Sequence, residues 1–160
     1  MRLIISCRDI YFIVPEKSAK TPKPPVVSKA DYEHLAAFRN ALREFLHFSE
    51  EAATAAGIPP QQHQAMLIIH GTAGNDCLTV GELASHLKIK HHSAVGLVNR
   101  MEADRLIAKS QNSHDRRQVL VRLTPRGRGA LEKLSATHKA ELVRIGPALG
   151  KIFKHLKSIS

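Results

Sequence analysis

The stretch that decides the fold is residues 78–127, LTVGELASHLKIKHHSAVGLVNRMEADRLIAKSQNSHDRRQVLVRLTPRG. Near its start, Thr79-Val80-Gly81-Glu82 has the spacing of a capping box. In a capping box, the threonine hydroxyl and the glutamate carboxylate each accept a backbone N–H at the start of a helix. The spacing therefore predicts a short helix, and Lys88-Ile89-Lys90 supplies the turn that ends it.

The next segment predicts a second helix from about His91 to Ala103. Its apolar residues recur at steps of three and four, which places them on one face of a helix. This inward set is Ala94, Leu97, Val98 and Met101. The outward set is His92, Ser93, Val95, Gly96, Asn99 and Arg100. Several outward side chains are small, so the backbone of this helix can closely approach the floor of a nucleic-acid groove.

Two strands and a further helix are predicted after this pair. Residues 106–110 and 118–123 have strand character, and turn-forming residues at 112–115 lie between them. Thr124 caps a long helix whose first position is Pro125. Two helices joined by a turn and followed by a hairpin are the parts of a winged helix-turn-helix. The predicted fold class is mainly α with a small β-hairpin wing.

The basic charge of the chain is concentrated in the same stretch. The chain carries a net charge of +10, and residues 79–128 hold ten Lys or Arg against four Asp or Glu. Residues 29–58 hold three against five. A basic excess on one segment is typical of a surface that binds a phosphate backbone. On charge alone, a solvated basic face explains the excess equally well.

The flanking segments suggest an arm and a pair of dimerisation regions. Residues 1–27 contain a proline-rich stretch and are predicted to be an extended or disordered arm. A helix is predicted over 28–58, with Ser28 and Asp31 at its cap, and a winged helix-turn-helix region over 59–128. Helices over 129–160 carry a long apolar stripe that Pro147 splits or kinks. The winged region is too small to bury both flanks, so a homodimer is expected.

The composition argues against several other classes of protein. Of the 160 residues, 43% are hydrophobic, yet no apolar run reaches the length that spans a bilayer. No membrane partner is therefore expected. No secretory signal is expected either, because Arg8 and Asp9 interrupt the apolar start and no small-residue cleavage site follows. The two cysteines, Cys7 and Cys77, lie far apart and indicate a reducing cytoplasm rather than a disulfide framework. We find no spacing typical of a nucleophile with its base, and no Gly-rich phosphate loop, so no enzyme and no catalytic residue are predicted.

These motifs resemble those of the MarR family of bacterial regulators (multiple antibiotic resistance regulators). The resemblance covers roughly residues 30–157 and depends on short motifs that follow one another in a fixed order. They are Gln62-His63-Gln64-Ala65, Leu78-Thr79-Val80-Gly81-Glu82-Leu83-Ala84, His91-His92-Ser93-Ala94-Val95, Leu97-Val98-Asn99-Arg100-Met101-Glu102, Asp115-Arg116-Arg117 and Val121-Arg122-Leu123-Thr124.

The resemblance implies a transcription regulator that binds a pseudo-palindromic operator in double-stranded DNA, as a cytoplasmic homodimer. It implies a repressor that a small ligand relieves. That ligand would be hydrophobic or phenolic, and no cofactor is implied. Residues 91–101 match the recognition helix and 111–118 the wing, with Asp115 shaping the turn. Together with the outward face, this gives the predicted DNA-binding residues Lys90, His91, His92, Ser93, Val95, Asn99, Arg100, Arg116 and Arg117.

Asn99 departs from the family pattern. Family members often carry an acidic residue there, which pairs with an arginine of the wing. Asn99 cannot form that ion pair, although its amide is able to hydrogen-bond a base edge.

Three alternatives remain open at this point. His86, His91 and His92 cluster in sequence and suggest metal sensing, but their spacing is not that of a zinc site and no metal is predicted. Cys77, placed in a loop before the capping box, suggests a redox-responsive regulator, although no basic neighbour activates it. The third alternative is a protein–protein interaction module, because winged helices also serve that role.

Overall fold

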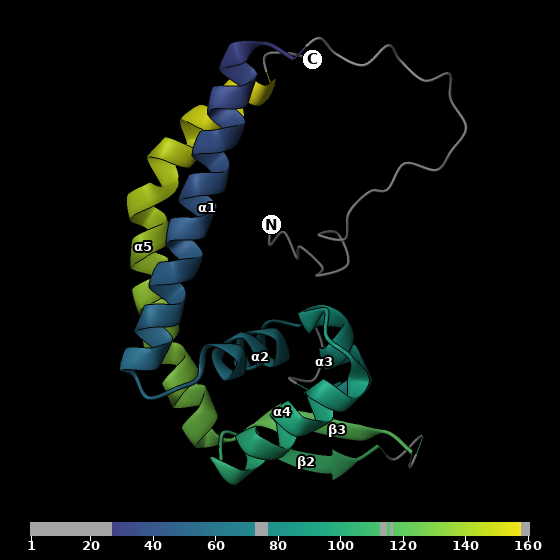
Figure 1. Ribbon diagram of the computed structural model, residues 1–160. Helices are drawn as coiled ribbons and strands as arrows, with labels where there is room; N and C mark the ends of the chain where they lie inside the picture. The colour runs from purple at the N-terminus through teal and green to yellow at the C-terminus, as the bar shows by residue number, and fades with distance from the viewer. Residues whose placement is uncertain (1–26, 73–76, 113–114, 116, 158–160) are drawn as a thin grey trace, which may run out of the picture. The chain divides into compact units, whose positions relative to one another are not determined.

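The computed structural model describes residues 27–72, 77–112, 115 and 117–157 of the chain. The contacts divide it into a winged unit, residues 48–139, and a helical unit made of residues up to 47 and from 140 onward. Two long helices, α1 (Lys29–Ala55) and α5 (Pro125–Lys157), contribute to both units (Figure 1). The predicted arm over 1–27 lies almost wholly outside the described residues.

The winged unit contains three short helices. They are α2 (Pro60–Gly71), α3 (Val80–Leu87) and α4 (His91–Ala103). The capping box before α3 is complete: Thr79 N–H donates to Glu82 Oε2 at 2.8 Å, and Glu82 N–H donates to Thr79 Oγ1 at 3.1 Å. Two donors that a helix start leaves unsatisfied are thereby satisfied. The predicted start of α4 at His91 and its end at Ala103 are both confirmed.

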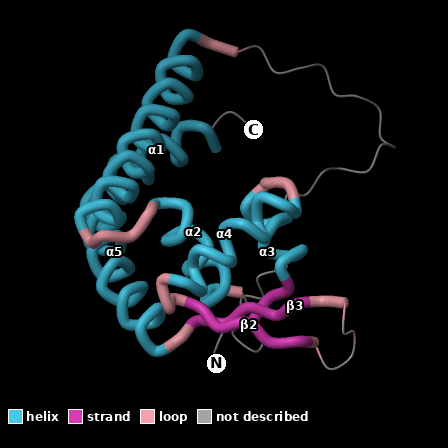
Figure 2. Tube along the Cα trace, turned by 60° about the horizontal axis from the view of Figure 1, so that its bottom comes forward, coloured by secondary structure: helices cyan, strands magenta, loops and turns pink. Residues whose placement is uncertain are grey.

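A three-stranded antiparallel sheet, rather than a two-stranded hairpin alone, completes the winged unit. Its strands are β1 (Cys77–Thr79), β2 (Ile107–Gln111) and β3 (Val119–Leu123), in the order β1-β3-β2. Leu78 pairs with Val121, so a three-residue strand before α3 joins the hairpin. Figure 2 shows β2 and β3 lying along one side of the helices of this unit. Cys77 therefore lies in a strand, and its predicted placement in a loop was wrong.

The core of the winged unit lies where α2, α3, α4 and the sheet meet. The inward face predicted for α4 is confirmed, because Ala94, Leu97, Val98 and Met101 are each at most 1% exposed. The first turn of α5 packs just as closely. A Cβ atom added to Gly127 would lie 2.0 Å from the carbonyl oxygen of Leu106, so only glycine fits there. The start of α5 is thus pressed against the segment that joins α4 to β2.

The helical unit consists of the first part of α1 and the last part of α5. Ser28 and Asp31 cap α1 as predicted: Ser28 N–H donates to Asp31 Oδ2 at 2.7 Å, and Asp31 N–H donates to Ser28 Oγ at 3.2 Å. The hydrogen bonds from Ser28 hold the pKa of Asp31 below its usual value. Across the two helices, the rings of Phe38 and Phe153 lie 5.5 Å apart.

The helix α5 continues through Pro147, so Pro147 does not split it into separate helices, which was one of the two predicted outcomes. Proline removes one N–H, which leaves the carbonyl of Val143 without its helical donor. Val143 is 70% exposed, so water reaches this part of the helix and can satisfy that carbonyl. Within the described residues, no helix is both long enough and apolar enough to cross a membrane.

Candidate nucleic-acid interface

The outer face of α4 is open to solvent along its whole length. His92, Ser93, Asn99 and Arg100 are exposed, and Val95 is 39% exposed. Because the opposite face is fully buried, this helix is held firmly by its apolar side while its polar side stays free. A helix fixed in this way can present side chains to the major groove of a duplex.

The start of α4 is a favourable position for a phosphate. Lys90 stands at the cap, and no side chain caps the helix there. No acidic residue lies in its first turn, where His91 and His92 are exposed. Free N–H groups and the positive end of the helix dipole attract anions, and the Lys90 ammonium adds to that attraction. The geometry therefore favours a backbone phosphate at this end of the helix.

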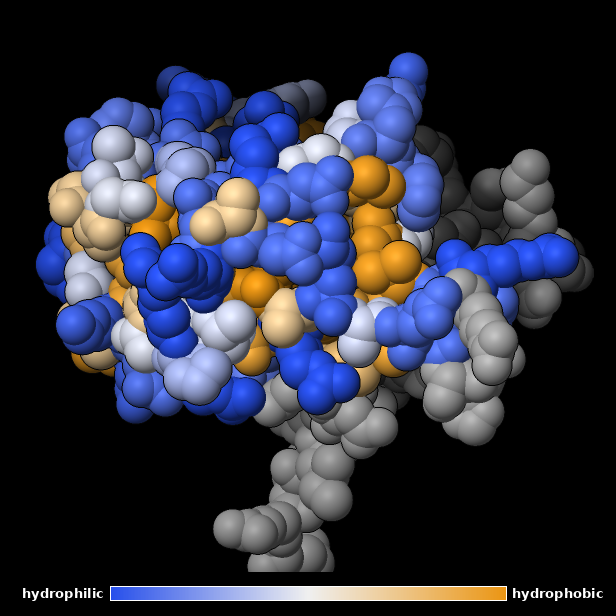
Figure 3. Space-filling view, turned by 90° about the horizontal axis from the view of Figure 1, so that it is seen from below, coloured by the Kyte–Doolittle hydropathy of each residue, from blue (hydrophilic) through white to orange (hydrophobic). Residues whose placement is uncertain are grey.

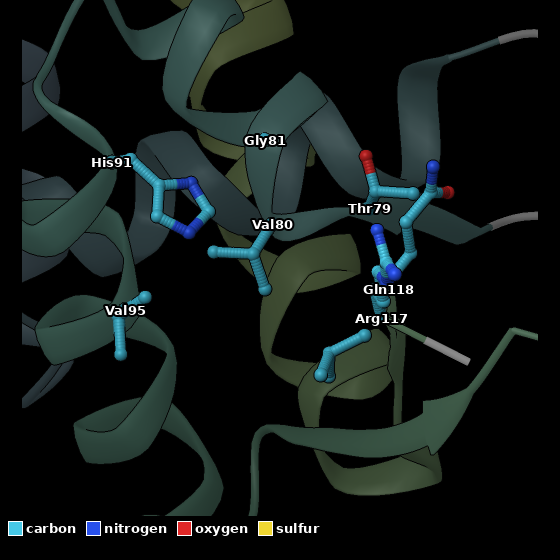
Figure 4. Close-up of a pocket in the computed structure, with 8 residues that line it drawn as sticks. Thr79, Val80, Gly81, His91, Val95, Arg117 and Gln118 are labelled. Atoms are coloured by element: carbon cyan, nitrogen blue, oxygen red, sulfur yellow. The ribbon is translucent and has the colours of Figure 1, made fainter. Parts of the chain in front are cut away.

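A cavity of about 250 Å³ separates the start of α4 from the wing. In Figure 4, His91 and Val95 lie on one side of it, Arg117 and Gln118 lie on the other, and Val80 is between them. Three of the predicted DNA-binding residues, His91, Val95 and Arg117, are thus brought to one place. The cavity combines an apolar floor with cationic and amide groups, and it lies between the two parts of a winged helix that contact DNA.

The described part of the wing is shaped by Asp115. Its carboxylate accepts the N–H of Arg117 at 3.0 Å, and its carbonyl accepts the N–H of Gln118 at 2.9 Å. These bonds close the turn and direct the chain into β3, as aspartate often does in turns. Arg117 is exposed. Arg116, the other arginine predicted to bind DNA, lies outside the described residues.

Lys109 connects the recognition helix to the wing. This lysine, on β2, donates to Asn99 Oδ1 at 3.0 Å, and its Nζ lies 2.6 Å from Glu102 Oε2. The ion pair that Asn99 cannot form is therefore made one turn later, by Glu102, and with a lysine of the strand. Asn99 still contributes as a neutral acceptor, which leaves its amide N–H groups available for a base edge.

The two turns that bracket α4 place basic residues in the left-handed conformation. Lys88 has a φ of 56° and Arg105 a φ of 58°. Side chains with a Cβ adopt this region at a cost of about 1–2 kcal/mol, and glycine is the usual choice. Lys88 lies in the turn between α3 and α4 and is exposed. Lysine therefore occupies a position that the backbone conformation favours for glycine, and it places a positive charge next to α4.

A pair of histidines lies in the winged unit away from this face. His63 of α2 and His138 of α5 are buried, and their rings stack with centroids 4.8 Å apart. Burial, together with the neighbouring His138 ring, lowers the pKa of His63. Among the residues that the structure describes, no three His, Cys, Asp or Glu are grouped to hold a metal ion.

Several residues of this face were not foreseen from the sequence. Lys109, Thr79, Gly81 and Gln118 contribute to the brace or to the cavity wall. Alternation along β2 would have placed Lys109 on the outer side, but its partners on α4 depend on how helix and strand pack.

Figure 3, which views the molecule from below, shows mainly hydrophilic side chains with apolar patches between them.

Comparison with known proteins identifies relatives of one kind. Residues 56–118 match the model of the MarR family. The chain is 32% identical over 84 residues to the transcriptional activatory protein BadR of Rhodopseudomonas palustris, which covers 52% of this chain and 48% of that protein. It is 28% identical over 94 residues to the HTH-type transcriptional repressor MdtR of Bacillus subtilis, covering 59% of each. The chain thus spans about half the length of the curated relatives it matches.

Solved structures share the fold over most of the chain. A mutant of MepR from S. aureus, bound to an oligodeoxyribonucleotide, has a TM-score of 0.61 at 20% identity, covering 81% of this chain and 98% of that one. NadR in complex with 4-hydroxyphenylacetate has a TM-score of 0.61 at 21% identity, covering 86% and 93%. These structures show the fold, and within it residues 56–118 are similar to the MarR family model and to curated transcription regulators.

Proposed function

We propose that the protein is a transcription regulator that binds double-stranded DNA through α4 and the wing. The observation that carries the proposal is the open polar face of α4, whose uncapped, basic start lies across a cavity from Arg117. Such a surface contacts phosphates with its cations and reads base edges with Ser93, Asn99 and Arg100. A regulator of this kind acts where the DNA is, in the bacterial cytoplasm, and needs no catalytic activity.

The proposal includes a homodimer that reads two half-sites. The helical unit leaves several large apolar side chains in water, on both α1 and α5. The most exposed are Tyr32 at 63% and Val143 at 70%. Covering these side chains with a second copy would remove them from water and place two recognition helices on one duplex. Pseudo-palindromic operators follow from that symmetry.

The sense of regulation and the effector are the further parts of the proposal. Of the two curated relatives, BadR is described as an activator and MdtR as a repressor. We favour a repressor relieved by a small hydrophobic or phenolic ligand, because a MarR-fold neighbour, NadR, was solved with 4-hydroxyphenylacetate. Such a ligand would bind more tightly to a dimer conformation in which the spacing of the two α4 helices does not match the two half-sites of the operator. It would thereby lower the affinity for DNA.

A salt titration tests the central claim. The full chain is mixed with a fluorescent random duplex, and binding is followed by anisotropy between about 50 and 200 mM salt. Phosphate contacts predict a linear fall of log affinity with log salt. Arg117→Ala should weaken binding several-fold and reduce the slope, whereas Arg39→Ala, an exposed arginine of the helical unit, should change neither. If the protein does not bind at the lowest salt, it is not a DNA-binding protein, and the interaction-module alternative replaces this proposal.

A further inference from the structure

A second pocket of the winged unit, of about 300 Å³, lies between the start of α2 and the end of α4. It is separate from the cavity beside the wing, with which it shares no residue. Its apolar surface comes from Pro59, Leu97 and Ala103. Its polar surface comes from Gln61, Gln62, Arg100 and Asp104. The volume is at the lower end of the range for small-molecule sites.

Gln62, one of the residues that line this pocket, carries a buried acceptor without a hydrogen-bond partner in the described part of the chain. Its side chain is only 3% exposed, and its Nε2 donates to Asp104 Oδ2 at 2.8 Å. Its Oε1 is buried and accepts no hydrogen bond from any residue that the structure describes. Turning the amide over would set Oε1 against the carboxylate of Asp104, so the orientation is fixed. A buried acceptor without a donor is costly, and it is satisfied when a ligand supplies one.

Two of the polar groups of the pocket, on Gln62 and Asp104, favour a hydrogen-bond donor rather than an anion. Gln62 Oε1 and the Asp104 carboxylate both attract N–H or O–H groups and repel a phosphate. The start of α2 also offers little to an anion. Pro60, at the first position of α2, has no N–H, which removes one of the donors that an anion would use there. The attraction of a helix start for anions is therefore weak here.

We propose that this pocket binds a small apolar amino acid, or a zwitterion like it. The ammonium group would donate to Gln62 Oε1 and to Asp104, since an anion and a neutral oxygen together favour a cationic donor. Arg100, which forms no ion pair with any residue that the structure describes, would hold the carboxylate. The apolar side chain would lie against Pro59 and Ala103, which are exposed in the pocket.

The site has a consequence for regulation, which rests on the proposed function. Arg100 belongs to the face of α4 that is proposed to contact DNA. An amino acid bound to Arg100 would withdraw its guanidinium from the duplex, so ligand and DNA would compete. The pocket is thus a direct effector site on the recognition helix.

Calorimetric titration of the full chain without DNA tests the site. The probes are L-valine, L-leucine and L-phenylalanine, with two partial analogues of leucine: 4-methylpentanoate, which lacks the amine, and isoamylamine, which lacks the carboxylate. At least one amino acid should bind with a millimolar or tighter dissociation constant. For leucine, each partial analogue should bind about tenfold more weakly. If none of the three amino acids binds, or the partial analogues of a bound leucine bind equally well, the assignment is wrong.

Variants locate the binding. Gln62→Met keeps the size of the side chain but removes its acceptor, and it should weaken amino-acid binding at least tenfold without lowering the melting temperature. Gln64→Met, an exposed position of the same helix, is the matched control and should bind as the unmodified protein does. Asp104→Asn removes the negative charge that faces the ammonium group and should weaken binding at least as much as Gln62→Met. Equal binding by the Gln62 and Gln64 variants would place the ligand elsewhere and overturn the proposal.

The link to DNA is measured separately. Saturating amino acid should lower the affinity for a random duplex several-fold in the unmodified protein and leave it unchanged in Gln62→Met. If the amino acid fails to bind while DNA binding persists, this inference falls and the proposed function stands. If the amino acid binds while the protein ignores DNA, the proposed function falls and the site stands.

Discussion

Met101 of the winged unit is fully buried, whereas Val143 of the helical unit is 70% exposed, although both lie on helices with apolar residues at steps of three and four. The winged unit covers its own apolar side chains within one chain. The helical unit leaves several of its own in water. The difference teaches that the same pattern forms a buried core in one unit and leaves apolar side chains exposed to solvent in the other.

The largest expected effect tests how tightly the winged unit is packed. Gly127→Ala would place a Cβ atom 2.0 Å from the carbonyl oxygen of Leu106, so the backbone must shift. We expect a loss of about 3 kcal/mol in the free energy of unfolding, measured by urea denaturation. Gly129→Ala, two residues on, meets no atom within 4 Å and should gain about 0.5–1 kcal/mol as a helix position. Equal midpoints for the two variants would contradict this account.

The next effect tests whether the exposed side chains of the helical unit are an interface. Val143→Glu should raise the dissociation constant of the proposed dimer at least tenfold, or about 1.4 kcal/mol, because a charge would be buried there. Leu67→Glu is the control in the winged unit, where Leu67 is 49% exposed on α2. Sedimentation equilibrium measures both. If Leu67→Glu dissociates the dimer and Val143→Glu does not, the interface lies in the winged unit instead.

A smaller effect tests the turn between α3 and α4. Lys88→Gly removes the cost of a Cβ atom at a φ of 56°, and after the entropy of glycine is counted we expect a gain of about 0.5–1 kcal/mol. Thermal unfolding checks the gain. Lys90→Gly is the control, because Lys90 has a φ of −68° and should lose stability instead. A loss at both positions would mean that the Lys88 side chain makes a stabilising contact.

The smallest effect concerns pH and the winged unit. Burial lowers the pKa of His63, so the unfolded chain takes up a proton at a higher pH than the folded one. This contribution to stability is present above the ordinary pKa of about 6.5 and is lost as pH falls through the lower, folded value. Urea midpoints at pH 7.5 and 5.5 should differ less for His63→Gln than for the unmodified protein. His91→Gln, on the exposed face, should not reduce the difference.

Much of the winged unit was predictable because its signals are local. The capping box, the spacing of apolar residues in α4 and the Thr124-Pro125 start of α5 each depend on a few neighbouring residues. The strand β1 was not predictable, since three residues form a strand only by pairing with Val121 and its neighbours, far along the chain. Lys109 was missed for a similar reason, because its partners Asn99 and Glu102 lie on another element.

In the proposed interface, sequence identified residue types better than contacts. His91, Val95 and Arg117 were predicted separately, and only the fold places them around one cavity. Asn99 appeared to leave the wing without a brace, but a lysine on β2 and a glutamate one turn along α4 supply it. The sequence left open whether α5 is split or kinked at Pro147, because the exposure that makes Pro147 tolerable depends on tertiary structure.

Thr124 connects the start of α5 to the segment between α4 and β2 through hydrogen bonds. Its hydroxyl donates to the carbonyl of Arg105 at 2.7 Å and accepts the N–H of Gly127 at 3.0 Å. Its own N–H donates to the carbonyl of Leu106 at 3.0 Å. These hydrogen bonds join the first turn of α5 directly to Arg105 and Leu106, which lie between α4 and β2. Any rotation of the first turn of α5 would therefore also displace the end of α4, which carries Arg100.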